Sequence, residues 1–435
     1  MKTNNIRLNL SLFTTTLAGL TLLSLTGNSA LAVNWTITDL GALGAPGTES
    51  YESRAYNINN AGQVAGKGVL LVGGVPAGHY VVWSNGTQID LGIRINSSNV
   101  DSAPINDAGQ VAGVIEDERS LPFLWQNGVV TRLAVLPDTY GDGVARVNGI
   151  NASGAVVGLN GTYRGGGRNV AVRWQGGTVT DLGLDFGEPT GINDHSHIAI
   201  NGLYYFTGQS GVLAGGVTNV VAMPGLHPSY GLTEALDLNN AGQVCGRFIV
   251  DRTVDSRHHA FLWQGGIGTP LPEYAIGVSS ESEAVALNNR GHAVGWAAAA
   301  SGNPALLWRD GGMTNLSALP EVTAAGWWGL TARDINDHDQ IVGMGYHNHG
   351  GHLTAFLLSP VVVPSLTIKR SGTDGVLSFP TQTGVRYQLQ SSTALTAASW
   401  LDVGVPYVGT GGVLSANVTI GPEPKKFFRL RLLDN

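Results

Sequence analysis

The stretch Ile58-Asn59-Asn60-Ala61-Gly62-Gln63-Val64-Ala65-Gly66 decides the fold of this 435-residue chain. It is the first of seven copies of an Ile-Asn-x-x-Gly-Gln-Val-x-Gly pattern, in which Ile or Leu precedes an asparagine. The seven asparagines are Asn59, Asn106, Asn151, Asn193, Asn239, Asn288 and Asn336. They recur every 42 to 49 residues. A period of this length indicates an array of similar structural units.

Each copy predicts two β-hairpins. In the first, Asn-x-x-Gly is a tight turn, because asparagine bonds its own backbone and glycine adopts the left-handed conformation. In the second, a strand such as His259–Trp263 precedes an Asn-Gly or Gly-Gly turn and a further short strand. Four strands per copy match one propeller blade. The seven asparagines are therefore interpreted as structural turn residues. The fourth copy departs most, with Ile200 in place of a glycine and its third strand placed near Gly211–Ala214.

The two ends of the repeat array complement each other. The last copy stops after its third strand, at Leu358, whereas the segment Trp35–Gly41 resembles the fourth strand of other copies, such as Gly177–Gly183. An N-terminal strand that completes the last copy would leave no free sheet edge. The sequence thus predicts an all-β fold: a seven-bladed β-propeller over residues 33–360, closed by its N-terminal strand.

Residues 1–32 have the pattern of a secretory signal peptide. Lys2 and Arg7 precede the apolar, hydroxyl-rich stretch 8–25, and Ala30-Leu31-Ala32 is a small-residue cleavage signature. We therefore expect an extracellular or cell-surface protein, with the periplasm as an alternative, and no membrane span in the mature chain. The single cysteine, Cys245, allows no internal disulfide and is interpreted as a small buried residue.

The repeat ends before residue 361. Residues 361–435 contain strand-like runs at 384–390, 413–420 and 426–432, separated by turn residues. They predict a small fibronectin- or immunoglobulin-like β-sandwich, with Tyr387 and Trp400 as its core aromatics.

The charge is divided unevenly along the chain. Residues 33–360 hold 15 Lys and Arg against 27 Asp and Glu, whereas residues 361–435 hold 7 against 4. An acidic main domain argues against nucleic acid and against anionic membranes as partners of that domain. We expect a monomer.

The repeat resembles an extracellular family named for its His-Ala-Phe signature, the HAF repeat. The triplet stands at His259-Ala260-Phe261, with a weaker echo at Thr354-Ala355-Phe356, and the resemblance covers residues 34–360. It implies a secreted bacterial protein of propeller type, and it transfers no catalytic residues.

Function is expected on the loops that do not repeat, because variable loops on a rigid scaffold commonly carry it. These loops join the second strand to the third and one blade to the next, on the face opposite the tight turns. The aromatic candidates for ligand binding there are Tyr140, Tyr163, Tyr230, Trp327 and Trp328. The candidate metal ligands are His347, His349 and His352, and Asp138 and Asp142 around Gly141 resemble part of a calcium loop.

No catalytic motif was found: the sequence has no Gly-x-Ser-x-Gly elbow, no His-Glu-x-x-His and no Walker loop. No catalytic residues and no cofactor are therefore assigned, beyond calcium or another divalent metal at the sites above. The leading hypothesis is a secreted protein that binds an extracellular glycan or protein, with the C-terminal domain as spacer or attachment module. The alternatives are a polysaccharide lyase or glycoside hydrolase acting in the central depression, and a structural cell-surface component.

Overall fold

A computed structural model gives the structure of the chain. It describes residues 13–15, 20–22, 35–44, 52–95, 102–115, 120–136, 143–162, 170–184, 187–202, 210–221, 223, 225–227, 231–251, 253–274, 281–300, 302–347, 351–361, 366–371, 374–381, 386–394, 399–410, 412–421 and 426–433. The chain divides into two compact units, Trp35–Ser359 and a second unit of Met1–Asn34 with Pro360–Asn435. Both consist mainly of antiparallel strands.

Within Trp35–Ser359 the described strands form seven consecutive sheets. Five of them have four strands in chain order. The first contains β4 (Ser53–Ile58), β5 (Val64–Val72), β6 (Val75–Ser84) and β7 (Thr87–Ile95), and the third contains β11 (Gly143–Ile150), β12 (Val156–Thr162), β13 (Val170–Gln175) and β14 (Thr178–Asp181). The fourth contains β15 (Glu188–Ile192), β16 (Ile198–Asn201), β17 (Gly211–Ala214) and β18 (Val217–Val220); the fifth contains β19 (Leu232–Leu238), β20 (Val244–Ile249), β21 (His259–Gln264) and β22 (Ile267–Pro270); and the sixth contains β23 (Ser282–Leu287), β24 (Ala293–Ala297), β25 (Ala305–Arg309) and β26 (Gly312–Asn315). The sheet after β7 has three strands, β8 (Val111–Ile115), β9 (Leu121–Gln126) and β10 (Val129–Arg132), and Ile105 adds an isolated bridge to Val111. The described fold is thus all-β and β-propeller-like.

The last of these sheets contains a strand from the other end of the chain. Its order is β27 (Trp328–Ile335), β28 (Ile341–Tyr346), β29 (Leu353–Pro360) and β3 (Trp35–Asp39). Outside the strands themselves, the Leu40 amide donates to the Ala355 carbonyl at 3.0 Å. The N-terminal strand therefore completes the last sheet, as the sequence predicts.

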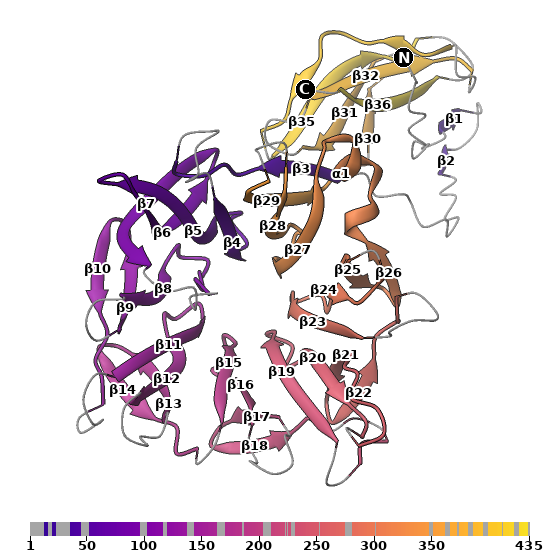
Figure 1. Cartoon of the computed structure of the whole chain (residues 1–435). Coiled ribbons are helices and arrows are strands. Elements are labelled where there is room, and N and C mark those ends of the chain that lie inside the picture. The colour runs from indigo at the N-terminus through magenta and orange to yellow at the C-terminus, as the bar shows by residue number, and fades with distance from the viewer. Residues whose placement is uncertain are drawn as a thin grey trace. The chain divides into compact units, whose positions relative to one another are not determined.

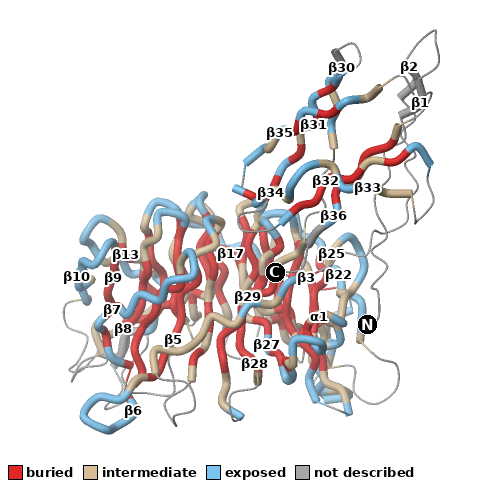
Figure 2. Tube along the Cα trace, turned by 90° about the horizontal axis from the view of Figure 1, so that it is seen from above, coloured by how far each residue is buried: buried red, intermediate tan, exposed pale blue. Residues whose placement is uncertain are grey.

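The last sheet also packs against the first. One cluster of buried side chains contains Val64 and Trp83 from the first sheet together with Val342 and Ala355 from the last. Figure 1 shows the sheets of this unit arranged around a common centre, with β4, β19, β23 and β27 nearest to it. In Figure 2 the buried residues follow these strands through the unit. The hydrophobic core therefore lies between successive sheets, and the innermost strands surround the centre.

The glycine at the end of the repeat is required by a β-bulge. The first strand of six sheets shows a register shift, as between Ala332 and Asp334. The shift brings the carbonyl of the bulged strand toward the second strand, and a Cβ built on Gly343 would lie only 1.9 Å from the Thr331 oxygen. Built Cβ atoms on Gly66, Gly158, Gly246 and Gly295 meet the corresponding carbonyls at 1.8 to 2.0 Å. Only glycine fits such an approach of two backbones.

The fourth copy meets the same constraint differently. Ile200 stands at the glycine position and is fully buried, and a bulge remains between Pro189 and Gly191. Here the glycine, Gly187, lies on the facing segment. A Cβ built on it would lie only 2.8 Å from the Ile200 side chain. The fourth sheet therefore keeps four strands, with β17 at the predicted Gly211–Ala214.

The first-hairpin turns have the expected geometry. The third residue after the asparagine has a positive φ in all seven copies, including the two that lack glycine, Ser196 (60°) and Asp339 (57°). In each turn this residue's amide donates to the asparagine carbonyl, as Gly62 does to Asn59 at 3.0 Å. The left-handed position is thus set by the hairpin, and glycine is the residue that adopts it with least strain.

The described helices are short. They are a 3-10 turn at Leu316–Ala318 and α1 (Pro320–Ala324), between β26 and β27. No described helix combines the length and the apolar character that crossing a bilayer requires.

Two sheets make up the described part of the C-terminal segment. One contains β30 (Thr367–Ser371), β31 (Asp374–Pro380) and β35 (Val413–Thr419). In the other, β32 (Arg386–Ser392) pairs with β33 (Leu401–Asp402), β34 (Tyr407–Val408) and β36 (Phe427–Leu433). The two sheets share one apolar cluster, to which Leu377, Tyr387 and Phe428 belong. Tyr387 is a core aromatic as predicted, but Trp400 is not, because it lies half-buried against Arg429 outside that cluster. The second unit also contains the short pair β1 (Phe13–Thr15) and β2 (Leu20–Leu22).

Candidate binding face

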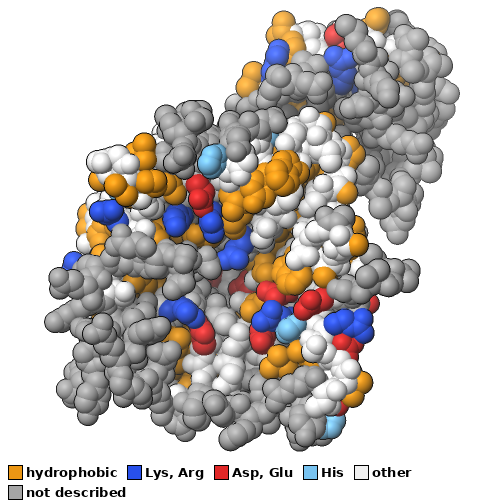
Figure 3. All heavy atoms as spheres, in the orientation of Figure 1, with side chains coloured by type: hydrophobic (Ala, Val, Ile, Leu, Met, Phe, Trp, Pro, Cys, Tyr) orange, Lys and Arg blue, Asp and Glu red, His pale blue; other side chains and the backbone are white. Residues whose placement is uncertain are grey.

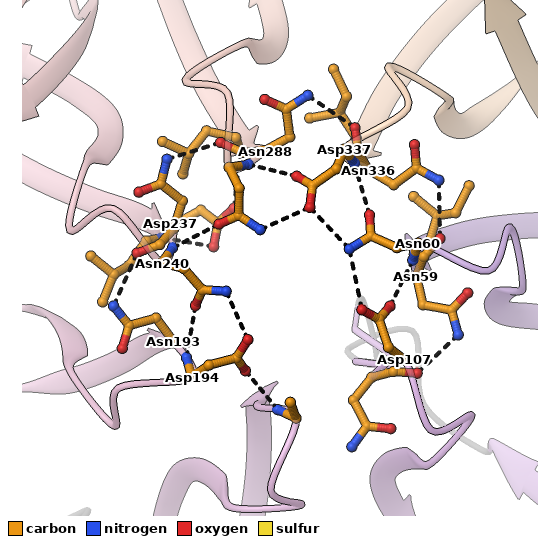
Figure 4. Close-up of a pocket in the computed structure, with 18 of the residues that line it drawn as sticks. Asn59, Asn60, Asp107, Asn193, Asp194, Asp237, Asn240, Asn288, Asn336 and Asp337 are labelled. Atoms are coloured by element: carbon orange, nitrogen blue, oxygen red, sulfur yellow. Dashed lines mark hydrogen bonds between the residues drawn. The ribbon is translucent and has the colours of Figure 1, made fainter.

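The seven repeat asparagines form a closed cycle of hydrogen bonds. Each Nδ2 donates to the backbone carbonyl of the next copy's asparagine, at 2.9 to 3.1 Å. The cycle closes when Asn336 donates to Asn59. Each Oδ1 meanwhile accepts backbone amides of its own turn, as Asn336 does from Gln340. All seven asparagines are at least 95 % buried. Through these two sets of hydrogen bonds, each asparagine joins its own turn to the neighbouring sheet (Figure 4).

The residues that follow the asparagines form a second, outer series of contacts. The Asp194 carboxylate accepts the Ala152 amide, and Asn289 and Asp337 make equivalent contacts with their neighbours. The series is interrupted at Ala152, which has no side-chain acceptor for the preceding copy. The side chains of this series mainly satisfy one another.

These two series line a central pocket of about 200 Å³ on the turn face. Its walls are asparagine and aspartate side chains together with the Ile or Leu before each asparagine (Figure 4). Because the polar groups already bond across the sheets, the pocket is first a feature of the scaffold.

Asp237 on β19 also lines this pocket, and Asp334 on β27 holds the equivalent position, two residues before the repeat asparagine of the last sheet. Burial raises the pKa of Asp237 to about 6, against the opposing effect of the Leu287 and Leu238 amides. Burial and then the charge of Asp237 raise the pKa of Asp334 to about 7. Asp334 accepts from the Ile58 amide, so each carboxylate also links its sheet to the next.

Charged side chains surround the centre at the other end of the innermost strands. Five residues before the repeat asparagine, six copies carry a charge: Arg54, Asp101, Arg146, Glu188, Glu234 and Glu283, of which Asp101 lies outside the described residues. Figure 3 shows acidic and basic groups gathered around the centre of this face. We call this the loop face, since the links that vary between copies also lie at this end of the strands.

Arg247, on the second strand of its sheet, joins two of these charges. It stands opposite Glu234 on the neighbouring strand and bonds it at 2.7 Å, and it bonds Glu283 of the next sheet at 2.7 Å. Burial opposes the charge of the guanidinium, but the carboxylates of Glu283 and Glu234 outweigh it and raise the pKa of Arg247 further. A single arginine thus holds two carboxylates in place on the loop face.

A second ion pair crosses between sheets on the same face. Arg146 bonds Glu188 at 2.8 Å, and Asn148 donates to the same carboxylate at 3.2 Å. More than half of the Arg146 side chain remains exposed. These groups present hydrogen-bond donors and acceptors on the loop face.

The two adjacent tryptophans have different environments. Trp327 is 3 % exposed, stacks on His347 with ring centroids 4.5 Å apart, and meets Phe356 edge-on. Trp328 is 59 % exposed and stacks on Tyr346 with centroids 4.2 Å apart. Trp328 begins β27, so it lies at the loop-face end of an innermost strand. The structure therefore presents one of the pair on the surface and packs the other inside.

Of the three candidate metal ligands, His347 is engaged within the protein. Its Nδ1 lies 3.1 Å from Asp39 Oδ2 and its Nε2 lies 3.0 Å from the Ala325 carbonyl. His352 is described, whereas His349 lies outside the described residues. Within the described ranges, no three His, Cys, Asp or Glu side chains lie together as metal ligands would.

The other sequence candidates lie outside the described residues: Tyr140, Tyr163, Tyr230, Asp138 and Asp142. Cys245 is fully buried, and its thiol donates to the Ala284 carbonyl at 3.4 Å. Burial, followed by the charges of Asp237 and Glu283, raises the pKa of this thiol well above its ordinary value.

The charge of the loop face was not predicted from the sequence. Its signal is positional, because Arg146, Glu188, Glu234 and Glu283 all precede a repeat asparagine by five residues. The pattern becomes visible only when the copies are aligned on their asparagines and read for charge rather than for identity.

No family model and no curated protein matches the sequence. Among solved structures, the chain is similar to an acylaminoacyl peptidase of Pyrococcus horikoshii, with 8 % identity, a TM-score of 0.47, and coverage of 79 % of this chain and 58 % of that one. A puromycin-hydrolysing peptidase of Mycobacterium tuberculosis has 10 % identity, a TM-score of 0.44 and coverage of 80 % and 61 %. TolB from Acinetobacter baumannii has 10 % identity, a TM-score of 0.38 and coverage of 72 % and 64 %. The chain thus spans about three-fifths of the length of these structures, and likenesses this distant carry no argument about its activity.

Proposed function

We propose that this chain is an exported seven-bladed β-propeller that binds an extracellular glycan on its loop face. The seven consecutive sheets would be the blades, with β3 completing the last. The closed cycle of asparagine hydrogen bonds supports this arrangement. In this proposal residues 1–32 are a signal peptide, and residues 361–435 are a small sandwich domain that serves as spacer or attachment module.

The observation that carries the binding proposal is the exposed indole of Trp328. Tyr346 holds the ring from one side, so the indole is presented as a fixed flat surface. Aromatic side chains supply large apolar contact area at low entropic cost, and sugar rings have apolar faces of matching size. The carboxylates and guanidinium of Glu234, Glu283 and Arg247 supply hydrogen-bond partners for sugar hydroxyls on the same face. Binding sites commonly combine an apolar platform with a few oriented polar groups in this way.

The test is a glycan-array screen of the mature protein, followed by titration of the best ligand against the Trp328→Ala variant. We expect at least a tenfold loss of affinity, because stacking on an indole contributes much of the contact. Val129→Ala is the matched control, since Val129 is 65 % exposed on β10, an outer strand. Equal affinity of the Trp328→Ala variant and the unaltered protein would contradict the proposal.

The same screen separates the alternatives. Incubation of the ligand with the protein, with and without EDTA, shows whether oligosaccharide is released. Release of oligosaccharide would show that the protein is a lyase or hydrolase rather than a binding protein. If EDTA stops the release, the activity depends on a metal ion. If the chain binds no glycan but binds a defined extracellular protein through Trp328, the ligand is a protein and the glycan proposal is wrong.

A further inference from the structure

The sheet of β32 and β36 carries a basic face directed away from its own core. Tyr387 and Leu389 of β32, and Phe428 and Leu430 of β36, belong to the apolar cluster between the two sheets. Side chains alternate along a strand, so the residues between them lie on the opposite face of the sheet. On that face Gln388 and Gln390 are buried, whereas Arg386 and Arg431 are exposed.

Register brings the outward arginines together. Arg431 stands opposite Gln388, Arg429 stands opposite Gln390, and Arg386 lies two pairs further along, opposite Leu433. Diagonal neighbours on antiparallel strands lie about 7–8 Å apart, so Arg386 and Arg431 are within reach of one extended ligand. We call Arg386, Arg429 and Arg431 the arginine triad.

The triad is not neutralised within the described part of the unit. Arg386 and Arg431 are exposed, and no carboxylate in the described residues forms an ion pair with either. The one acid on the facing strands, Asp402, accepts a hydrogen bond from Gln390 at 2.7 Å. Burial and then the charge of Arg431 lower the pKa of Arg429, so like charges repel here without compensation.

Arg429 is also fixed in position. Its Nε donates to Gln390 Oε1 at 2.7 Å, and its guanidinium lies 4.3 Å from the centre of the Trp400 ring. Stacking on an aromatic ring leaves the edge of a guanidinium free for a further planar acceptor. The face thus combines a positioned arginine, an aromatic side chain and two exposed arginines.

We propose that the arginine triad is a binding site for an acidic polysaccharide, whose carboxylates pair with the guanidinium groups. Arginine matches a carboxylate with two parallel hydrogen bonds, and an anion relieves the repulsion between Arg429 and Arg431. The site would be distinct from the loop face of the other unit and would attach the protein to an acidic matrix. The acidic charge of residues 33–360, 15 Lys and Arg against 27 Asp and Glu, leaves this role to the C-terminal segment.

The experiment uses the full mature chain with polygalacturonate as probe, measured by titration calorimetry at low and high salt. Arg431→Glu is expected to weaken binding at least tenfold, and the Arg386→Glu, Arg431→Glu double variant to abolish it. Lys369→Glu is the matched control, because Lys369 is exposed on β30, in the other sheet of the same unit, and changes the net charge equally. Trp328→Ala is expected to leave polygalacturonate binding unchanged, which separates this site from the proposed loop-face function.

Several outcomes would overturn the proposal. The first is that Arg431→Glu and Lys369→Glu weaken polygalacturonate binding equally, which would indicate an effect of net charge alone. The second is that polygalacturonate does not bind, and the third is that neutral dextran binds as tightly as polygalacturonate. Equal binding of single-stranded DNA at the same charge concentration would also overturn it, by indicating a general polyanion surface. Circular dichroism of each variant shows that the fold is retained.

Discussion

The turn face and the loop face of the Trp35–Ser359 unit are built from opposite ends of the same strands, yet they differ in character. On the turn face, one asparagine per copy repeats seven times and bonds its successor at 2.9 to 3.1 Å. On the loop face, the equivalent position five residues earlier changes from Arg146 to Glu188 to Thr331. Repetition follows from a packing constraint shared by all sheets, whereas variation is permitted where each sheet meets solvent.

This contrast predicts that substitutions on the turn side damage folding and that substitutions on the loop side spare it. The largest effect is expected for Gly343→Ala, because its Cβ would lie 1.9 Å from the Thr331 oxygen and both strands must move. We expect a loss of at least about 3 kcal/mol in unfolding free energy, measured by denaturant titration. Gly312→Ala is the control, since the nearest atom to its Cβ is 3.5 Å away and the backbone is unstrained. Similar losses for the two variants would contradict the role of the bulge.

A somewhat smaller loss is expected for Asn336→Ala. This change removes the bond that closes the cycle to Asn59 and leaves buried amides of its own turn without an acceptor. Each unsatisfied buried group costs about 1–3 kcal/mol. Asn289→Ala removes only the exposed outer contacts of its side chain, with the Asn240 amide and with Asp337 Oδ2, so it should lower the denaturation midpoint far less. If both variants have the same denaturation midpoint, the closed cycle of asparagine hydrogen bonds does not contribute specially to joining the last sheet to the first.

The two buried carboxylates, Asp237 and Asp334, predict a pH dependence of stability. The folded-state pKa values, about 6 for Asp237 and about 7 for Asp334, exceed the ordinary aspartate value of about 3.9. The folded state therefore binds more protons than the unfolded state between about pH 4 and 7, and this contribution to stability falls as the pH rises through that window. The Asp237→Asn, Asp334→Asn variant should show a flatter profile of unfolding free energy against pH across the same window. Parallel profiles would show that neither pKa is raised.

The smallest effect on stability is expected for Trp328→Ala. Its indole is 59 % exposed, so its loss should change the unfolding free energy by about 0.5 kcal/mol. Trp327→Ala, one residue away, removes a side chain that is 3 % exposed and should cost about 3–5 kcal/mol. Thermal denaturation of the two variants measures the contrast directly, and equal shifts would remove the distinction between scaffold and surface at this point of the chain.

Much of the architecture was predictable because the same strand and turn pattern occurs seven times in the sequence. The turn residues, the third strand of the fourth copy at Gly211–Ala214 and the pairing of β3 with β29 all agree with the sequence pattern. The C-terminal unit was less predictable, since β30, β31, β33 and β34 were missed and Trp400 lies outside the core. Without a repeat, an aromatic residue in a short strand-rich segment gives no sign of the side on which it packs.

The candidate site was predicted only in part. Trp327 and Trp328 are indistinguishable in sequence, but Trp327 packs against His347 and Phe356 just before β27, whereas Trp328 begins the strand on the surface. The Arg247–Glu234–Glu283 group joins residues from two sheets and up to 49 positions apart. Such a contact has no local signature.

The sequence by itself determined the number of copies, the turns and the exchange of a terminal strand. These depend on local backbone conformation and on a period, and both are properties of short segments. The tertiary structure alone decided that the asparagines form a closed cycle, that Asp237 and Asp334 interact, and that Arg247 joins two carboxylates. Those features arise from distances between different copies, which are set only when the sheets pack around a common centre.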